Sequence, residues 1–361
     1  MKRVIFLADS ISNQTAGIHY FGLQLIRNIQ KTFPHYEFHS ISSSIIDIDN
    51  IQQHIIPVKT SIPQHLRIRQ LTTIPRKVNT LNPDVVIELA HFGPFKLNPA
   101  IKKVTVIHDM TAITHPEFHS ASSHHIQKLT LPRIVKNADL ILTNSIFTKK
   151  EISRVTGIDY SAKIHVLYPT LKYLNRSQED HPASTQKTSP YFLSVGTIEP
   201  RKNYVSVIKA FEQFHRNHST YELIIAGRKG WKNKQIYQAL DNSVAKASIQ
   251  VKENVSEEYL QQLYKEASAF ISASHIEGFG LPILEAASFG TPLIVAKNSA
   301  QQEIVKDYGL TFNSLEISEL ASCMTTLATD HSATTQLKLK SQALFEDITS
   351  IRKKQYASLK F

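Results

Sequence analysis

Two glutamates, Glu277 and Glu285, stand eight residues apart in the stretch Glu-Gly-Phe-Gly-Leu-Pro-Ile-Leu-Glu. The apolar residues 269–271 before them predict a short buried strand, and Pro282 and Gly290 suit the first position and the end of a helix. In an open α/β sheet, ligands bind beside the carboxyl ends of the strands, where this loop is expected. Because ionised carboxylates are strong acceptors for O–H donors, the pair suits the hydroxyl groups of a ligand.

The loop between the two glutamates also suits a phosphate. The N–H groups of Gly280 and Leu281 lie at the expected helix N-terminus, where unpaired donors favour an anion. We therefore assign Gly278, Phe279, Gly280 and Leu281 to one binding loop. Two glutamates at this spacing also fit an ordinary strand-to-helix turn with surface carboxylates, so the assignment depends on the embedding Gly-Phe-Gly-Leu-Pro and on the later Gly-Thr-Pro.

These residues resemble the E-x7-E motif of the retaining glycosyltransferases of family four. The resemblance implies the α/β fold called GT-B, with two Rossmann-like, doubly wound domains facing a central cleft and a C-terminal helix crossing back to the first domain. It also implies an acceptor site in the first domain and a nucleotide-sugar site in the second. Glu277 would then bind hydroxyls of the sugar, and Glu285 those of the ribose.

A cationic turn follows the apolar segment 191–197, which reads as a strand and contains Gly196. Arg201 and Lys202 stand in the segment Glu-Pro-Arg-Lys-Asn, which leads into a helix with one apolar face. A planar guanidinium, an ammonium group and a helix N-terminus together suit a diphosphate. The segment resembles that of the family, whose Arg and Lys neutralise the departing nucleotide diphosphate and replace a divalent metal ion; the resemblance also places Gly196 in the donor site.

Other loops of the second half are expected on the nucleotide side. Arg228 and Lys229 follow the strand predicted at residues 223–227. Family members usually have a glycine and an aromatic residue beside the base, where this chain has Glu253 and Asn254, so we assign Asn254 to the donor site and leave the base open. Residues 298–303 resemble another donor-site loop of the family.

Two candidate positions lie in the first half of the chain. His108 and Asp109 end the strand predicted at residues 103–107, and the family carries a His-Asp pair there, with the histidine against the donor sugar. The resemblance therefore implies a catalytic His108 and a donor-binding Asp109. Gly17 resembles a family glycine that lets the backbone approach the diphosphate. With Gly17 and Gly22 alone, this loop lacks the G-x-G-x-x-G of a dinucleotide site, which disfavours a nicotinamide-dependent oxidoreductase.

The elements that position these residues alternate between strand and helix. Strands are expected near residues 4–7, 37–41, 84–89, 103–107, 139–143 and 163–167, with helices between several of them, which favours a parallel sheet covered on both faces. The length of 361 residues allows two domains. We predict an acceptor domain at 1–173, a polar linker at 174–189, a nucleotide-sugar domain at 190–346 and a returning helix at 347–361.

Composition excludes several alternatives. The single cysteine, Cys323, rules out an internal disulfide and a cysteine-based metal cluster. Asp47 and Asp49 match a D-x-D pattern but lie far in sequence from the other candidates, so we assign no metal and no cofactor other than the nucleotide-sugar co-substrate. The start of the chain has a run of five apolar residues before Asp9, too short for a signal peptide or a membrane span. A cytoplasmic location is expected, with the inner face of the plasma membrane left open.

The basic charge is concentrated in the first half. Residues 1–190 contain 22 Lys and Arg against 13 Asp and Glu, whereas residues 191–361 contain 19 against 17. An anionic membrane surface or a phosphorylated lipid carrier fits this excess, as does a merely solvated surface. No nucleic-acid-binding motif accompanies it, so nucleic acid is not expected as a partner.

These expectations combine into one function. We predict transfer of a hexose, mannose from GDP-mannose, to a saccharide acceptor that is lipid-linked, in the synthesis of a surface polysaccharide such as lipopolysaccharide. Glucosyl or rhamnosyl transfer, a sugar-nucleotide epimerase and a non-catalytic nucleotide-sugar-binding protein remain the alternatives. The sequence specifies no oligomeric state.

Overall fold

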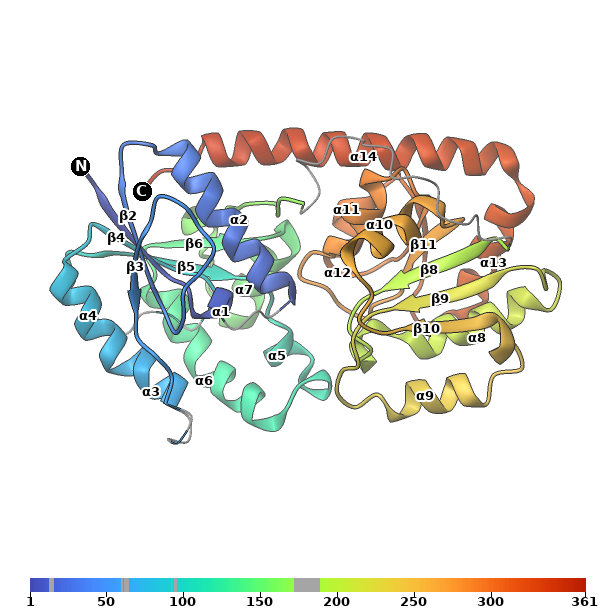
Figure 1. Ribbon diagram of the computed structural model, residues 1–361, viewed down its shortest axis with the longest axis horizontal. Coiled ribbons are helices and arrows are strands. Elements are labelled where there is room, and N and C mark those ends of the chain that lie inside the picture. The colour runs from blue at the N-terminus through green and yellow to red at the C-terminus, as the bar shows by residue number, and fades with distance from the viewer. Residues whose placement is uncertain (13–15, 60, 62–64, 92, 94–95, 172–188) are drawn as a thin grey trace. The chain divides into compact units, whose positions relative to one another are not determined.

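The computed structural model describes residues 1–12, 16–59, 61, 65–91, 93, 96–171 and 189–361 (Figure 1). It divides into two compact units, Met1–Lys172 with Ser350–Phe361, and Tyr173–Thr349. Of the linker predicted at 174–189, all but the last residue lies outside the described residues. Each unit has one sheet in which all neighbouring strands run parallel.

The first unit is built on a seven-stranded sheet in the order β3-β2-β1-β4-β5-β6-β7. Its strands are β1 (Arg3–Leu7), β2 (Glu37–Ser42), β3 (Gln52–Ile55), β4 (Val85–Glu88), β5 (Lys102–Ile107), β6 (Leu140–Thr143) and β7 (Ile164–Val166). Its helices are α1 (Asp9–Ser12), α2 (Ala16–Thr32), α3 (His65–Leu71), α4 (Thr73–Leu81), α5 (Thr111–Thr114), η1 (Pro116–Phe118), α6 (Ala121–Asn137), α7 (Ile146–Thr156) and η2 (Ser161–Lys163).

Both faces of this sheet are buried. Val4 and Phe6 of β1 lie in one core cluster with Leu25 and Ile29 of α2, while Ile5, between them, lies in a cluster on the opposite face. Successive side chains of a strand point to opposite faces, so a strand that is apolar at every position needs cover on both sides. The unbroken apolar runs of the sequence therefore form the central strands.

The second unit is built on a six-stranded sheet in the order β10-β9-β8-β11-β12-β13. Its strands are β8 (Tyr191–Val195), β9 (Glu222–Ala226), β10 (Ile249–Lys252), β11 (Ala269–Ser272), β12 (Leu293–Ala296) and β13 (Leu310–Phe312). Its helices are η3 (Pro200–Lys202), α8 (Tyr204–His215), α9 (Lys234–Asp241), η4 (Lys246–Ser248), α10 (Glu257–Glu266), α11 (Leu281–Ser288), α12 (Ser299–Val305), α13 (Ile317–Thr329) and the first part of α14 (His331–Ala357).

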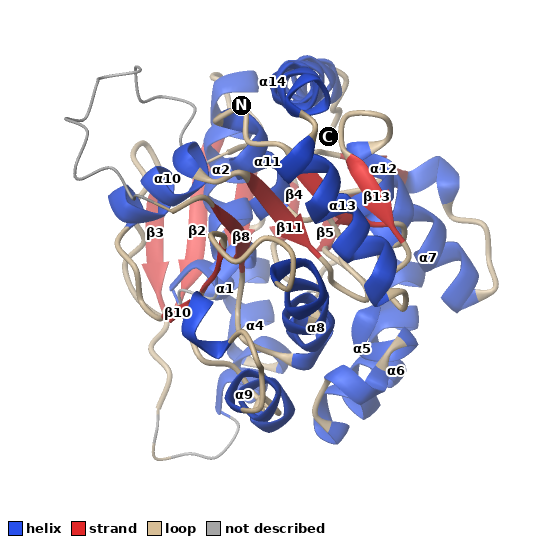
Figure 2. Ribbon diagram, turned by 90° about the vertical axis from the view of Figure 1, so that its right-hand side faces the viewer, coloured by secondary structure: helices blue, strands red, loops and turns tan. Residues whose placement is uncertain are grey.

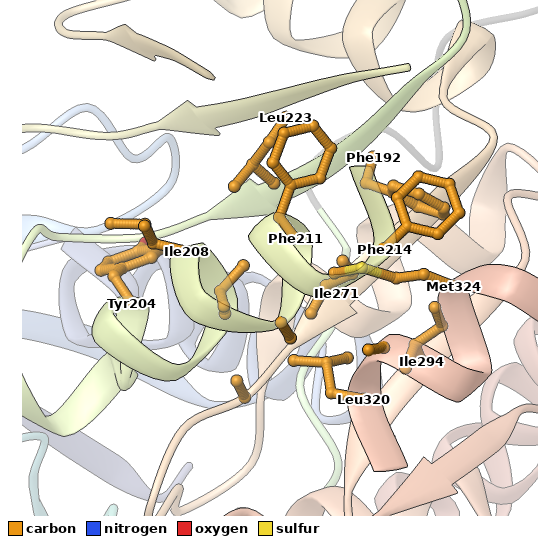
Figure 3. Packing of buried hydrophobic residues seen from close by; sticks show 14 of the residues in the cluster. Phe192, Tyr204, Ile208, Phe211, Phe214, Leu223, Ile271, Ile294, Leu320 and Met324 are labelled. Carbon is orange, nitrogen blue, oxygen red and sulfur yellow. The ribbon is translucent and has the colours of Figure 1, made fainter. Parts of the chain in front are cut away.

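Helices cover both faces of the second sheet as well. Figure 2 shows β8 and β11 between α8 on one side and α10 and α11 on the other. On the α8 side, Phe211 and Phe214 pack with the strand residues Phe192 and Ile271 and with Met324 of α13 (Figure 3). The apolar face predicted for this helix is thus the one that contacts the sheet.

The last helix differs from its prediction. The sequence placed its start at residue 347, but α14 begins at His331. Its buried residues Leu337, Ser341, Leu344 and Ile348 recur at helical spacing, and the fully buried serine interrupts the apolar stripe. The Ser341 hydroxyl donates to the carbonyl oxygen of Thr291 at 2.7 Å, which satisfies a polar group in an otherwise apolar position.

The C-terminal end of α14 packs on the first unit. Tyr356 and Leu359 belong to the core cluster that also holds Val4 and Phe6. The backbone N–H of Tyr168 donates to the side chain of Gln355 at 2.8 Å. The helix therefore begins in the second unit and ends in the first.

Candidate active site

The order of the second sheet determines where its loops meet. β8 pairs with β9 on one side and with β11 on the other, so the chain order reverses at β8. At such a switch point the loops that follow the two neighbouring strands diverge and leave room for a ligand. Arg201 and Lys202 lie in η3, after β8, and Glu277 lies in the loop after β11.

These three predicted site residues form one ion cluster. Nη1 of Arg201 donates to Oε2 of Glu277 at 2.7 Å, and Nζ of Lys202 donates to Oε1 at 2.6 Å. The Ser274 hydroxyl donates to the same Oε1 at 2.8 Å. Charge-assisted hydrogen bonds of this length are among the stronger polar contacts in proteins.

A fourth member of the cluster, Glu199, was not predicted. Its Oε1 accepts from Nε and Nη2 of Arg201 at 3.0 and 2.7 Å. Arg201 also donates from Nη1 to the carbonyl oxygen of Ile276 at 3.1 Å. The cluster of Glu199, Arg201, Lys202 and Glu277 thus contains two cations and two carboxylates, and its formal charges cancel.

The two carboxylates of the cluster have pKa values shifted in opposite directions. Burial opposes ionisation of Glu277, but Arg201 and Lys202 outweigh it and lower the pKa of Glu277 to about 2. Burial raises the pKa of Glu199, against the opposing effect of the same two cations. Glu277 is therefore fully ionised at neutral pH, and Glu199 is the carboxylate of the pair that protonates more readily.

Two glycines shape the loops around the cluster. A Cβ atom at Gly196 would lie 2.9 Å from Cε of Lys202, so a larger residue there would displace the Lys202 side chain from its position. Gly280 has φ of 101° and stands at the N-cap of α11, in a region that other residues rarely adopt. The predicted loop glycines thus serve close approach and a sharp turn into the helix.

Side chains from α12 and its N-cap hold the loop that carries Glu277. Nδ2 of Asn298 donates to the carbonyl oxygens of Ser274 and His275 at 3.1 and 2.9 Å, and Nε2 of Gln301 donates to that of Ser274 at 2.9 Å. The N–H of Glu277 donates to Oγ of Ser299 at 3.0 Å. The segment predicted as a donor-site loop therefore braces the Glu277 loop.

The other predicted donor residues of this unit follow the same edge of the sheet. Glu285, half-buried on α11, accepts a hydrogen bond from the Tyr264 hydroxyl at 2.8 Å. Arg228 and Lys229 are exposed after β9, with Lys229 over the Tyr237 ring at 5.4 Å. Asn254 is exposed after β10, just before Ser256, whose hydroxyl caps α10 as predicted. Their roles toward a donor stay predictions.

In the same loop, Phe279 is buried and Leu281 is the first residue of α11, while Gly278 lies between strand and helix. The strand-loop-helix arrangement expected for residues 269–288 is thus confirmed.

In the first unit, the predicted pair follows β5. His108 is buried, and its Nε2 donates to the carbonyl oxygen of Leu89 at 2.8 Å. The rings of His108 and Phe21 form an edge-to-face pair with their centroids 5.1 Å apart. Burial lowers the pKa of His108, so its imidazole is neutral. Oδ1 of Asp109 accepts from the backbone and the hydroxyl of Thr111 at 2.9 and 2.6 Å.

His91 is a further residue of this region that sequence reasoning missed. Its ring lies 6.1 Å from that of His108, and burial and then the neighbouring His108 lower the pKa of His91 to about 4. The available signal was its place just after the buried strand β4, where a polar residue faces the carboxyl edge. Gly17 lies within α2, next to residues outside the described part.

Within the described residues, no group of three or more His, Cys, Asp and Glu side chains is placed to hold a metal ion. Among those same residues, no helix is both long and apolar enough to span a bilayer.

The family of glycosyl transferases group 1 matches residues 176–343, which include the ion cluster and its braces. This part of the chain is a group 1 glycosyl transferase domain. The O-antigen chain mannosyltransferase B of Escherichia coli is 28% identical over 344 residues, which cover 89% of each chain. The O-antigen chain mannosyltransferase RfbU of Salmonella typhimurium is 27% identical over 216 residues, 60% of this chain and 58% of that one.

Solved structures show the same fold. A crystal structure of Anabaena HepE, in complex with UDP and glucose, superposes with a TM-score of 0.73 at 17% identity and covers 98% of both chains. The structure of WaaG, a glycosyltransferase of lipopolysaccharide biosynthesis, gives a TM-score of 0.73 at 11% identity. These structural matches confirm the predicted fold of two parallel α/β sheets. The domain match and the O-antigen mannosyltransferases confirm the predicted family.

Proposed function

We propose that this protein is a retaining glycosyltransferase that transfers mannose from GDP-mannose to a saccharide acceptor in the synthesis of a surface polysaccharide. The observation that carries the proposal is the pair of cations, Arg201 and Lys202, held by Glu277 at the switch point of the second sheet. The two relatives named as O-antigen mannosyltransferases support the choice of sugar and pathway.

The cations supply the main catalytic contribution. As the bond between sugar and diphosphate breaks, negative charge builds on the departing diphosphate, and fixed positive groups stabilise it without a metal ion. Their charges are balanced by carboxylates in the structure, so a diphosphate binds by replacing Glu277 as their partner. Glu277 then becomes available as an acceptor for the sugar hydroxyls, the role that the resemblance implies.

The resemblance gives His108 a role toward the donor sugar. His108 is neutral because it is buried, so it acts toward the sugar as a hydrogen-bonding group rather than as a cation. The sequence identifies no covalent nucleophile. We infer that the acceptor attacks the anomeric carbon from the face from which the diphosphate leaves. That attack retains the configuration at the anomeric carbon.

The acceptor would be lipid-linked and reached at an anionic membrane. Lys128, Arg133 and Lys136 are exposed on α6, which contains no acidic residue, and Leu129 among them is 64% exposed. Each basic residue near an anionic leaflet contributes about 1 kcal/mol of attraction. The exposed face of α6 therefore supports peripheral membrane binding.

A screen of nucleotide sugars tests the function. Thermal unfolding is followed with GDP-mannose, UDP-glucose and dTDP-rhamnose, since a ligand that binds the folded state raises the Tm. We expect GDP-mannose to raise the Tm of the wild type and to have little effect on Arg201→Ala. Incubating the stabilising donor with and without a saccharide acceptor then separates transfer from epimerisation. No stabilisation by any donor would contradict the proposal.

A further inference from the structure

Glu199 contacts Arg201 in a way that can fix the orientation of its guanidinium group. It precedes Pro200 and η3, and its side chain is 1% exposed. Oε1 accepts both Nε and Nη2 of Arg201, at 3.0 and 2.7 Å. Glu277 and the carbonyl oxygen of Ile276 contact Nη1 of the same guanidinium group. The guanidinium group of Arg201 therefore donates to acceptors from two different loops, the turn after β8 and the loop after β11.

The contacts of Glu277 and Glu199 with Arg201 differ. Glu277 is shared between Arg201 and Lys202 and stands in the loop that follows β11. Glu199 forms its ion pair with Arg201 and comes from the same turn as Arg201 itself. Glu199 contacts Nε and Nη2 of Arg201, whereas Glu277 contacts Nη1, so the two carboxylates do not share a nitrogen of the guanidinium group.

Glu199 is also a costly residue to bury. Its Oε2 has no hydrogen-bond partner among the described residues, and burial disfavours its ionised form. A buried carboxylate oxygen without a donor lowers stability, so packing alone gives no reason for a glutamate here. Its effect on Arg201 gives that reason.

We propose that Glu199 is a positioning residue, which keeps the guanidinium of Arg201 aimed at the donor diphosphate after Glu277 has been displaced. The inference rests on the proposed function, because it assigns Glu199 a role in the same site. Since Arg201 acts on charge that develops as the bond breaks, a misaimed guanidinium lowers kcat more than it raises the KM for the donor.

A double-mutant cycle of Glu199→Ala and Arg201→Ala tests the inference. We expect Glu199→Ala to lower kcat by about 10- to 100-fold, with a donor KM within about threefold of wild type. The double variant is expected to be no slower than Arg201→Ala alone, because Glu199 acts only through Arg201. Glu199→Gln keeps an acceptor oxygen for the guanidinium and is expected to restore part of kcat.

Controls separate the possible failures. Glu151→Ala removes a comparable contact, the pair of Glu151 with Arg154 on α7, and is expected to leave the kinetics unchanged. If Glu199→Ala does not fold, the cycle is run with Glu199→Gln. Additive losses in the double variant, or wild-type kinetics in Glu199→Ala, overturn the inference while leaving the proposed function intact. Wild-type kinetics in Arg201→Ala would overturn the proposed function itself.

Discussion

At the scale of single residues, the ion cluster links charge to stability. The folded pKa of Glu277, about 2, lies below its ordinary value of 4.5. A carboxylate with a lowered pKa adds stability that is present above the ordinary value and is lost as pH falls toward the folded one. The contribution of Glu277 is therefore complete at neutral pH and disappears between about pH 4.5 and pH 2.

This linkage predicts how Glu277→Gln changes the pH dependence of unfolding. The free energy of unfolding of the wild type should fall more steeply than that of the variant between pH 4.5 and 2.5, by about 2 kcal/mol over this range. Urea titrations at a series of pH values measure both curves. Parallel curves over this range would show that the cations do not hold Glu277 ionised.

Arg201→Lys is predicted to be harmful although it conserves charge. An ammonium group cannot contact Glu199 and Glu277 from two ends at once, as the planar guanidinium does. We expect kcat to fall by about 10²-fold with the Tm changed by a few degrees. Steady-state kinetics and thermal unfolding check this, and a kcat near that of the wild type would show that charge alone suffices.

The sequence predicted the members of the site better than their partners. Arg201, Lys202 and Glu277 were each assigned from local patterns, and the structure brings them together. Their direct contact depends on β8 lying beside β11, which local patterns do not specify. Glu199 was missed although its partner Arg201 is only two residues away, because the local pattern does not show that its carboxylate is buried against the guanidinium group. His91 was missed because its neighbour His108 follows a different strand.

At the scale of elements, the brace formed by α12 and its N-cap controls the Glu277 loop. Asn298→Ala removes two hydrogen bonds to loop carbonyl oxygens, those of Ser274 and His275, and a typical hydrogen bond contributes about 0.5–1.5 kcal/mol. We expect a loss of stability in urea together with reduced turnover, because the loop that carries Glu277 loses its support. Asn137→Ala, at an exposed position on α6, serves as the control and should change neither. Normal turnover in Asn298→Ala would mean that the brace does not position the site.

Elements were predicted well where apolar runs are long and poorly at the edges. The predicted strands of the first half all form, but β3 and β10 were missed because each is an edge strand in which most side chains are at least partly exposed. β12 and β13 were also missed, although β6 and β7, which have the same lengths of four and three residues, were predicted. The predicted start of α14 was too late because Ser341, which is polar yet fully buried, interrupts the apolar pattern of the helix.

At the scale of the whole molecule, the basic charge of the first half predicts membrane binding. Replacing Lys128, Arg133 and Lys136 by Gln keeps the helical propensity of α6 and removes three charges. Sedimentation with vesicles rich in anionic lipid should show binding by the wild type at low salt, with weaker binding by the variant and at high salt.

The matched control for this prediction replaces three exposed lysines of the second unit, Lys265, Lys306 and Lys338, by Gln. It removes the same charge from another surface and should bind like the wild type. Equal loss in both variants would assign the attraction to net charge, and binding that is insensitive to salt would contradict an electrostatic contact.

The central claim is that Arg201 and Lys202 hold the diphosphate of the donor. The most direct test measures by calorimetry the affinities of GDP and GMP, and of UDP and UMP. It is made for the wild type and for the double variant Arg201→Ala, Lys202→Ala. We predict that the preferred diphosphate binds the wild type at least tenfold more tightly than its monophosphate, and that the variant loses this difference. An unchanged preference for the diphosphate in the variant would contradict the account.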